Sequence, residues 1–300
     1  MGECPSIPPT LRFNTTYTDT TSTPSSLRRS RLEKISLEGD DVINVYGFGN
    51  GGEALALLEV RGVTMDFGGL VALREVSFAI EQGEIVGLIG ANGAGKSTLF
   101  NIITGVQKPT AGMVFLDGQK IVGLTPHEIV RLGISRTFQL VRPFLNYTVE
   151  ENVRVGALFG HARHSEVYRR IDHVLKLTEL DAKRNLLVRT LPIEQRKMVE
   201  VARALASAPR LLLLDEPMAG LNSVEIERFI ELIRKISEEG ATVLVVEHVM
   251  KAIMSVSRRV IVLHAGLKLA EGTPETIMAN KDVVAVYLGE DYARSRNEKH

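Results

Sequence analysis

A glycine-rich segment followed by lysine and serine carries the strongest chemical signal in this sequence. It reads GANGAGKS from Gly90 to Ser97, directly after a strand-like run at 84–90 and before a helix-like run at 98–104. Glycines at this spacing let backbone N–H groups turn toward phosphate oxygens, and the following helix adds positive partial charge at its N-terminus. We expect Lys96 to contact the β- and γ-phosphates of ATP and Ser97 to ligate Mg²⁺. The predicted nucleotide-binding residues are Gly90, Asn92, Gly93, Ala94, Gly95, Lys96, Ser97 and Thr98.

Two adjacent carboxylates supply a second chemical signal. Asp215 and Glu216 follow four leucines at 211–214, a run typical of a buried central strand. Sheets of this kind bind ligands at the carboxyl ends of their strands. Two acids at such a place are costly unless cations or water meet them there. We expect Asp215 to hold Mg²⁺ through water and Glu216 to polarise the attacking water as a general base in ATP hydrolysis.

The elements that must position these residues begin near Leu55. From there the sequence alternates between strand-like and helix-like segments, which predicts a mainly parallel sheet with right-handed crossovers. Asp117-Gly118 between two short strand-like runs predicts a β-hairpin. The expected strands are 57–63, 72–80, 84–90, 113–116, 119–122, 210–215 and 242–247.

Helix starts are also legible. Thr125 with Glu128, and Thr148 with Glu151, have the spacing of capping boxes. Asn222 is the expected N-cap of a helix whose apolar face repeats every three or four residues. The stretch 148–208 contains only helix signals, so we expect a helical subdomain inserted into the α/β core.

Composition limits the function classes. The sequence has 36 Lys and Arg residues and 36 Asp and Glu residues, so its net charge does not favour binding to nucleic acid. The only cysteine is Cys4, which excludes an internal disulfide and fits a reducing cytosol. The apolar runs are far shorter than the roughly 20 residues of a spanning helix. The first thirty residues hold 12 Ser or Thr and 4 Pro, which predicts a disordered extension over 1–54.

Further motifs lie where the ABC transporter ATPase family has them, and the sequence resembles that family from about 57 to 291. Gln139 in RTFQLVRPF matches the glutamine that senses Mg²⁺ and the attacking water. The resemblance implies that Gln139 takes part in catalysis and contacts the metal ion. His248 matches the switch histidine that contacts the γ-phosphate, and Phe67 in DFGGLVAL matches the aromatic that stacks on adenine. MAGLN, 218–222, lies where the family has its D-loop, with Asn222 in place of the usual aspartate. The implied catalytic residues are Glu216, His248, Gln139 and Lys96, and the implied metal-binding residues are Ser97, Gln139 and Asp215.

The resemblance implies an α/β P-loop NTPase fold of the ABC type. It has a mainly parallel core sheet, an antiparallel β subdomain and a helical subdomain at about 148–208. The ATPase domain would cover 55–291, with a short tail at 292–300. An aromatic such as Phe67, taken without the resemblance, is more often a core residue.

Four segments look like the ATPase of branched-chain amino-acid importers: FGGLVAL, LVRPFLNYTVEENV, EHVMKAIM and AEGTPETIMANKDVVAVYLGE. The resemblance implies integral membrane permease subunits and a second ABC ATPase subunit as partners, and indirectly a solute-binding protein. It implies no nucleic acid, and a place at the cytoplasmic face of the cell membrane through the permeases. The end of the last segment, VYLGEDY, is also similar to the lipopolysaccharide-export ATPase.

Three alternatives stay open at this point. One is the ATPase of another ABC system, such as lipopolysaccharide export or urea and amide import. Another is a catalytically weak regulatory subunit, although Glu216, Gln139 and His248 would then serve no purpose. A third is a soluble ABC protein of repair or translation, a class that usually carries two cassettes or long coiled coils.

The sequence departs from the family at its signature, LSGGQ in most members. The matching residues are Leu191-Pro192-Ile193-Glu194-Gln195, just before a helix expected at 196–206. In the family this segment contacts the γ-phosphate bound to the opposite subunit. Pro192 offers neither hydroxyl nor N–H, and the Glu194 carboxylate would repel phosphate by roughly 1 kcal/mol at 4 Å in water, and more in a drier cleft. With Pro192 at N1 and Glu194 at N3 the helix should form normally while its anion-binding end is compromised.

A short apolar group follows Gln139 in the sequence. This group has no helical period, and we expect it to contact a cytoplasmic helix of a permease. It consists of Val141, Pro143, Phe144 and Leu145. The alternative is that this segment is a buried loop.

Overall fold

The computed structural model describes residues 56–137, 142–160 and 166–286. The predicted extension 1–54, the tail 292–300, Gln139 and Val141 lie outside these ranges. The predicted domain boundaries therefore stay predictions. Within the described ranges, every helix is too short or too polar to cross a membrane.

An antiparallel sheet is formed by four strands from the first part of the described chain, with β3 and α1 inserted between the second and the third. Its strand order is β2-β1-β4-β5. Asp117 and Gly118, both with positive φ of 50° and 75°, form the predicted turn between β4 and β5. The second strand of this hairpin is shorter than predicted and ends at Lys120. The strands are β1 (Ala56–Asp66), β2 (Val71–Glu81), β4 (Ala111–Leu116) and β5 (Gln119–Lys120).

A second, mainly parallel sheet carries the chemistry. Its order is β10-β9-β3-β8-β7-β6, and only β10 and β9 pair antiparallel. Strands β3, β8 and β7 are adjacent, so the segments that leave their carboxyl ends meet at one edge of the sheet. The strands are β3 (Ile85–Gly90), β6 (Ile134–Arg136), β7 (Leu211–Asp215), β8 (Thr242–Val246), β9 (Arg259–His264) and β10 (Leu267–Gly272).

Alternate residues of the central strands enter two different cores. Leu212 and Leu214 of β7 belong to the core on the side of the helices, whereas Leu211 and Leu213 belong to the core shared with the antiparallel sheet. This two-residue alternation is the pleat of a strand that is covered on both faces. It explains why these strands read as unbroken aliphatic runs.

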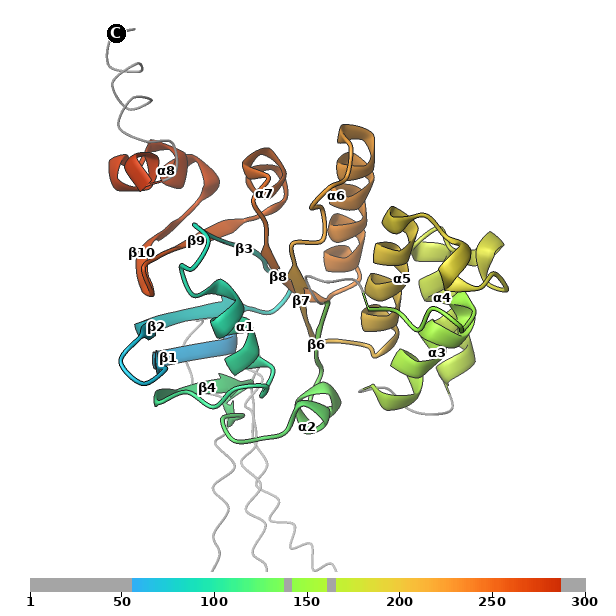
Figure 1. Ribbon diagram of the computed structural model, residues 1–300, viewed down its shortest axis with the longest axis horizontal. Coiled ribbons are helices and arrows are strands. Elements are labelled where there is room, and N and C mark those ends of the chain that lie inside the picture. The colour runs from blue at the N-terminus through green and yellow to red at the C-terminus, as the bar shows by residue number, and fades with distance from the viewer. Residues whose placement is uncertain (1–55, 138–141, 161–165, 287–300) are drawn as a thin grey trace, which may run out of the picture. The chain divides into compact units, whose positions relative to one another are not determined.

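The helices follow the predicted signals closely. Capping boxes are present at Thr125 and Thr148, as predicted, and Asn222 is the predicted N-cap of α6, where it also forms a capping box with Glu225. Figure 1 shows α3, α4 and α5 gathered at one end of the parallel sheet. The helices are α1 (Lys96–Ile103), α2 (Pro126–Arg131), α3 (Val149–Phe159), α4 (Val167–Leu177), α5 (Ile193–Ala206), α6 (Ser223–Glu238), α7 (Met250–Val256) and α8 (Pro274–Ala279), with 3₁₀ turns at Asp181–Lys183 and Val188–Thr190.

The start of α5 differs from the prediction. The helix begins at Ile193 rather than Arg196, and Pro192 is its N-cap rather than its first residue. Pro192 is extended, with ψ of 161°, and its carbonyl accepts the N–H of Arg196 at 3.0 Å. Glu194 is consequently the second helical residue, where its carboxylate still favours the positive end of the helix.

Candidate functional site

The glycine-rich loop lies between the end of β3 and the start of α1. Gly95 is the N-cap of α1 with φ of 105°, a left-handed conformation that favours glycine. A Cβ on Gly95 would lie 2.6 Å from the carbonyl oxygen of Ala72, and one on Gly90 would lie 2.6 Å from that of Leu263. Both glycines are therefore required by the close approach of neighbouring strands.

The N-terminus of α1 is open, unlike those of α3 and α6. No side chain caps it, and its first turn contains no acidic residue. In α3 and α6 the side chains of Thr148 and Asn222 accept the first N–H groups. The first amides of a helix need a partner, and an anion is the natural one where no side chain serves. The loop and α1 thus fit a phosphate group.

Lys96 lies beside this loop and is only 6% exposed. Its Nζ donates to the carbonyl oxygens of Gly90 at 2.6 Å and Ala91 at 3.1 Å. Burial lowers the pKa of Lys96, and the carboxylates of Glu216 and Asp215 oppose that shift. The ammonium group and the two predicted carboxylates are therefore close enough to interact, although they are far apart in sequence.

Asp215, at the end of β7, is 4% exposed and paired with an arginine that sequence reasoning missed. Arg136 Nη2 donates to Asp215 Oδ2 at 2.9 Å, and its Nη1 donates to Asn101 Oδ1 at 2.7 Å. Burial raises the pKa of Asp215, and the Arg136 guanidinium opposes this shift. Arg136 thus joins α1 to the strand end that carries the predicted Mg²⁺ ligand. The available signal was an arginine three residues before Gln139.

Glu216 and His248, which were predicted separately, are in direct contact. Glu216 Oε1 lies 2.5 Å from His248 Nε2, and the Glu216 side chain is 12% exposed. Glu216 has φ of 50°, a left-handed conformation that is strained for a residue with a side chain. Its N–H donates to the carbonyl of Val246 on β8 at 2.9 Å. The predicted contact of His248 with a γ-phosphate stays a prediction.

Glu247 is a second buried acid that the sequence analysis did not select. Its side chain is 2% exposed and accepts the N–H groups of Met218 at 2.5 Å and His248 at 3.1 Å. Burial raises the pKa of Glu247, and these backbone donors oppose the shift. The carboxylate therefore links the segment after β8 to the segment after β7.

Phe67 lies in the turn between β1 and β2, where its N–H donates to the carbonyl of Leu70 at 2.9 Å. Phe67 is 46% exposed, so the interpretation of this residue as part of the hydrophobic core is wrong. Strand β2 begins just beyond this turn. The carbonyl oxygen of its Ala72 lies so close to Gly95 that a Cβ there would be 2.6 Å away, so the turn is near the glycine-rich loop. An exposed ring on this strand turn is open to a planar ligand.

The segment after Gln139 is partly exposed. Phe144, Leu145 and Tyr147 are 44%, 44% and 52% exposed, whereas Pro143 is buried and does not belong to the predicted apolar group. The rings of Phe144 and Tyr147 meet edge to face, 5.6 Å apart. The side chain of Asn152 bonds both backbone groups of Phe144 at 2.8 and 3.0 Å. A fully buried loop is therefore excluded for these three exposed residues.

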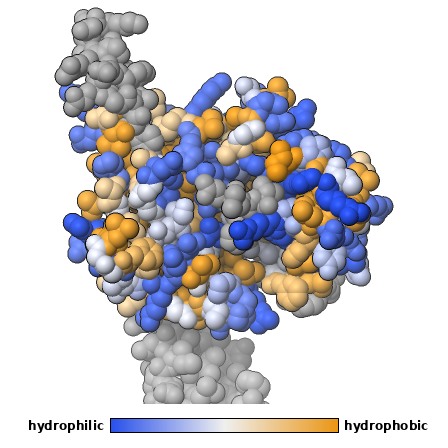
Figure 2. Space-filling model, in the orientation of Figure 1, coloured by the Kyte–Doolittle hydropathy of each residue, from blue (hydrophilic) through white to orange (hydrophobic). Residues whose placement is uncertain are grey.

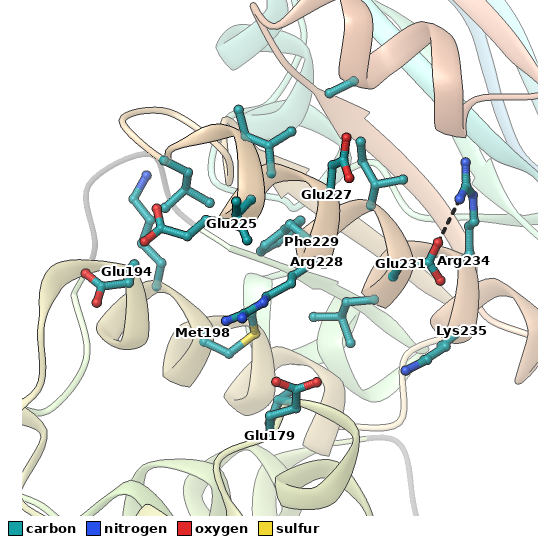
Figure 3. A pocket seen from close by; sticks show the side chains of 18 of the residues that line it. Glu179, Glu194, Met198, Glu225, Glu227, Arg228, Phe229, Glu231, Arg234 and Lys235 are labelled. Atoms are coloured by element: carbon teal, nitrogen blue, oxygen red, sulfur yellow. Dashed lines mark hydrogen bonds and ion pairs between the residues drawn. The ribbon is translucent and has the colours of Figure 1, made fainter.

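The altered signature lies at the start of α5. Pro192 and Ile193 are exposed, and Glu194 is partly buried. Glu194 lines a groove of about 890 Å³ that also includes Met198 of α5 and Arg228 of α6. Figure 3 shows the side chains of α5 and α6 facing each other across this groove. The residues 90–97 do not line it, so the groove is separate from the glycine-rich loop.

The arrangement offers a place for a divalent cation. Ser97 and Asp215 are the predicted ligands that the described ranges contain, and no group of three or more His, Cys, Asp or Glu within those ranges could hold a metal. Mg²⁺ commonly uses one or two protein oxygens and completes its shell with phosphate and water oxygens. The donor set at this edge fits that mode of binding.

Family models match two regions of the chain. The model described as ABC transporter matches residues 73–219. The model described as branched-chain amino acid ATP-binding cassette transporter matches residues 268–293. The first match includes the glycine-rich loop, the altered signature and both predicted carboxylates, and the second includes α8 and all of β10 except its first residue.

Curated relatives match most of the chain. The high-affinity branched-chain amino acid transport ATP-binding protein BraF of Pseudomonas aeruginosa is 42% identical over 254 residues, covering 78% of this chain and 98% of BraF. The protein LivG of Escherichia coli K12, whose name describes the same transport role, is 40% identical over 250 residues, covering 78% of this chain and 98% of LivG.

Solved structures share the fold. An ATP-binding cassette of an ABC transporter in its ADP conformation has a TM-score of 0.72 and 28% identity, covering 78% of this chain and 99% of that one. A dimeric ATP-binding cassette in a post-hydrolysis state, bound to ADP and Pi, has a TM-score of 0.65 and 32% identity, covering 72% and 98%. The predicted fold class is confirmed.

Proposed function

The chain belongs to the ABC transporter ATP-binding family, and from this premise we propose that it powers the import of branched-chain amino acids by hydrolysing ATP. The observation that carries the proposal is the meeting of three strand ends. Lys96 follows β3, the carboxylates of Asp215 and Glu216 end and follow β7, and His248 follows β8. Homologues named for this transport role support the choice of substrate.

The residues divide the chemistry between them. The glycine-rich loop and the open N-terminus of α1 bind the phosphates, and Lys96 neutralises their charge. Ser97 would ligate Mg²⁺ and Asp215 would hold it through water, and the bound ion would supply charge stabilisation to the transferring phosphoryl group. Glu216 accepts a proton from the attacking water as the general base. Its carboxylate follows the end of β7, where the phosphates bind, and one of its oxygens is bonded to His248. Phe67 stacks on the adenine ring.

A docking surface for a permease is part of this proposal. We define the apolar patch as Phe144, Leu145 and Tyr147, which are exposed and follow the predicted sensor Gln139 by five to eight residues in the sequence. Arg203 of α5 lies with its guanidinium carbon 5.4 Å from the centre of the Phe144 ring and donates to the Arg142 carbonyl at 3.2 Å. The patch is thereby fixed to α5 and suited to an apolar helix of a membrane partner. This partner places the chain at the cytoplasmic face of the membrane.

The altered signature supports a pair of unlike ATPase subunits. Pro192 and Glu194 offer a poor surface for the phosphate bound to an opposite subunit, whereas the glycine-rich loop of this chain is complete. A partner with an ordinary signature would give one efficient composite site. Most turnover would then depend on Glu216 of this chain. The same two residues favour the runner-up, a weak regulatory subunit, which turns over ATP poorly even beside its partner.

The test of nucleotide binding uses Lys96→Ala. Removal of the ammonium group should weaken MgATP binding at least about tenfold, because the phosphate charge then loses its nearby lysine. Fluorescence titration of the full chain with a labelled ATP analogue measures this. Lys268→Met is a matched control, since the ammonium group of Lys268 bonds the carboxylate of Glu271 within the same strand, β10. Unchanged affinity in Lys96→Ala would contradict the assignment of this site.

A further inference from the structure

Two ionisable side chains hold the turn that follows Glu216. The turn covers residues 217–222, between the end of β7 and the start of α6. Glu247 contacts it from the segment after β8, and Lys197 contacts it from α5. The turn is therefore connected to two elements outside its own β7–α6 unit.

Glu247 holds the first half of the turn. Its carboxylate accepts the N–H of Met218 at 2.5 Å, and the Met218 side chain is fully buried. The same carboxylate accepts the N–H of His248 at 3.1 Å. One buried acid thus fixes the backbone on both sides of the Glu216–His248 contact.

Lys197 holds the second half of the turn. Its Nζ donates to the carbonyl oxygen of Ala219 and lies 3.5 Å from that of Pro217. Lys197 also lines the groove between α5 and α6, as do Glu194 and Met198, which Figure 3 labels. Burial lowers the pKa of Lys197, and the carboxylates of Glu247 and Glu216 are among the groups that oppose this shift. The lysine is therefore kept partly desolvated beside the turn.

The turn needs such support because Glu216 is strained. Its φ of 50° is sparsely populated for a residue with a Cβ and persists where the surroundings fix it. The Glu216 carbonyl accepts the N–H of Ala219 at 3.3 Å, so the position of Ala219 affects the backbone of Glu216 directly. A displacement of about 1 Å at a catalytic group can cost roughly 100-fold in rate.

We propose that Lys197 and Glu247 are positioning residues that clamp the turn 217–222 and thereby hold Glu216 against His248. The proposal rests on the proposed function, in which Glu216 is the general base. It also connects α5, which begins within the altered signature, to that base through Lys197 and Ala219. A shift of α5 would move the Ala219 carbonyl through Lys197.

The experiment compares conservative and disruptive variants of the full chain. Lys197→Met keeps the aliphatic stem but removes the donor, and Glu247→Gln keeps the shape but places an amide N–H₂ near backbone donors. Each should lower kcat at least about tenfold, with KM and the affinity for a labelled ATP analogue within about twofold of the unaltered chain. Lys197→Arg, which keeps a donor, should recover most of the turnover.

The matched control is Arg234→Met. Arg234 also crosses from one element to another and donates to a backbone carbonyl, that of Ser255, at 3.1 Å. It lies on α6 and reaches the end of α7 rather than the turn. Its kcat should stay within about twofold of the unaltered value. A kcat loss in Arg234→Met equal to that in Lys197→Met would overturn the proposal, because any such bond would then matter equally.

A double variant separates positioning from general structural damage. In a Glu216→Gln background, Lys197→Met should cause no further loss of residual turnover, because both changes act through the same carboxylate. An equal loss in both backgrounds, or a rise in KM with kcat unchanged, would overturn the clamp. If Glu216→Gln itself leaves turnover unchanged, the proposed function fails instead. Should Glu247→Gln not fold, the comparison of Lys197→Met with Lys197→Arg decides the question alone.

Discussion

The buried pair of Arg136 and Asp215 permits a quantitative prediction about stability. The two side chains are 9% and 4% exposed, and their N···O distance is 2.9 Å. Replacement of Arg136 by Met leaves the buried carboxylate without this partner and also removes the bond to Asn101. Breaking one side of such a pair typically costs about 3–5 kcal/mol. We expect Arg136→Met to lower the free energy of unfolding by that amount.

The described ranges contain 222 residues, from 82, 19 and 121 in the three segments. For domains of this size about 1 kcal/mol shifts Tm by roughly 2–4 °C, so the expected decrease in Tm is roughly 6–20 °C. Urea denaturation at constant m measures the free energy itself. Arg61→Met is the control, because the Arg61–Glu59 pair has an arginine side chain that is 62% exposed and should contribute less than about 1 kcal/mol.

A double-mutant cycle with Asp215→Asn provides the refutation. If the pair interacts as the geometry indicates, the double variant should be more stable than the sum of the two single losses predicts, by more than about 0.5 kcal/mol. Additivity within about 0.5 kcal/mol, or a loss in Arg136→Met no larger than in Arg61→Met, would show that Arg136 does not stabilise Asp215.

Three further predictions concern other parts of the chain. Phe144→Asp should abolish co-purification with a permease while MgATP affinity stays unchanged, and a parallel loss of MgATP affinity would contradict a docking role. Glu194→Gly with Pro192→Ser should raise ATP turnover of the homodimer several-fold, because it removes roughly 1 kcal/mol or more of repulsion and restores donors; an unchanged rate would show that other groups hold the phosphate. Gly156→Ala should destabilise the protein by about 1–3 kcal/mol or more in urea denaturation, since its Cβ would lie 1.9 Å from the Arg203 carbonyl, and a neutral effect would refute this close packing of α3 on α5.

Local signals predicted much of the fold. The capping boxes at Thr125 and Thr148 could be predicted because a cap and its partner lie three residues apart, whereas Asn222 was predicted only as an N-cap and not as part of a capping box. The Asp117-Gly118 turn was readable because positive φ at both positions restricts the residue types. The central strands were readable from aliphatic runs, since both of their faces are buried.

The strands β6, β9 and β10 were not predicted. Strand β6 has only three residues, too few to show a period, and it forms by pairing with β7 across the sheet. Strand β10 is partly exposed and polar, so its pairing with β9 rather than its own pattern defines it. The first residue of α5 was misplaced because Pro192 is acceptable both as an N-cap and as a first helical residue.

The site was predicted to the extent that its residues form motifs. Asp215 ends a strand that was predicted from the sequence, and Lys96, Glu216 and His248 each follow such a strand; the sheet order brings all four to one edge. Arg136 and Glu247 were missed because their partners lie 79 and 29 residues away in sequence. Their importance depends on burial and on an acceptor or donor that only the folded chain supplies.

The most direct test of the proposed function is the ATP turnover of the Glu216→Gln variant. It is compared with the turnover of the unaltered chain, each assayed together with the ATPase partner. Loss of the general base should reduce kcat by about 10²–10⁴-fold while the affinity for MgATP stays within about twofold. The carboxylate removed is the one that lies 2.5 Å from His248 Nε2. Turnover that stays unchanged in Glu216→Gln would contradict the account of this site.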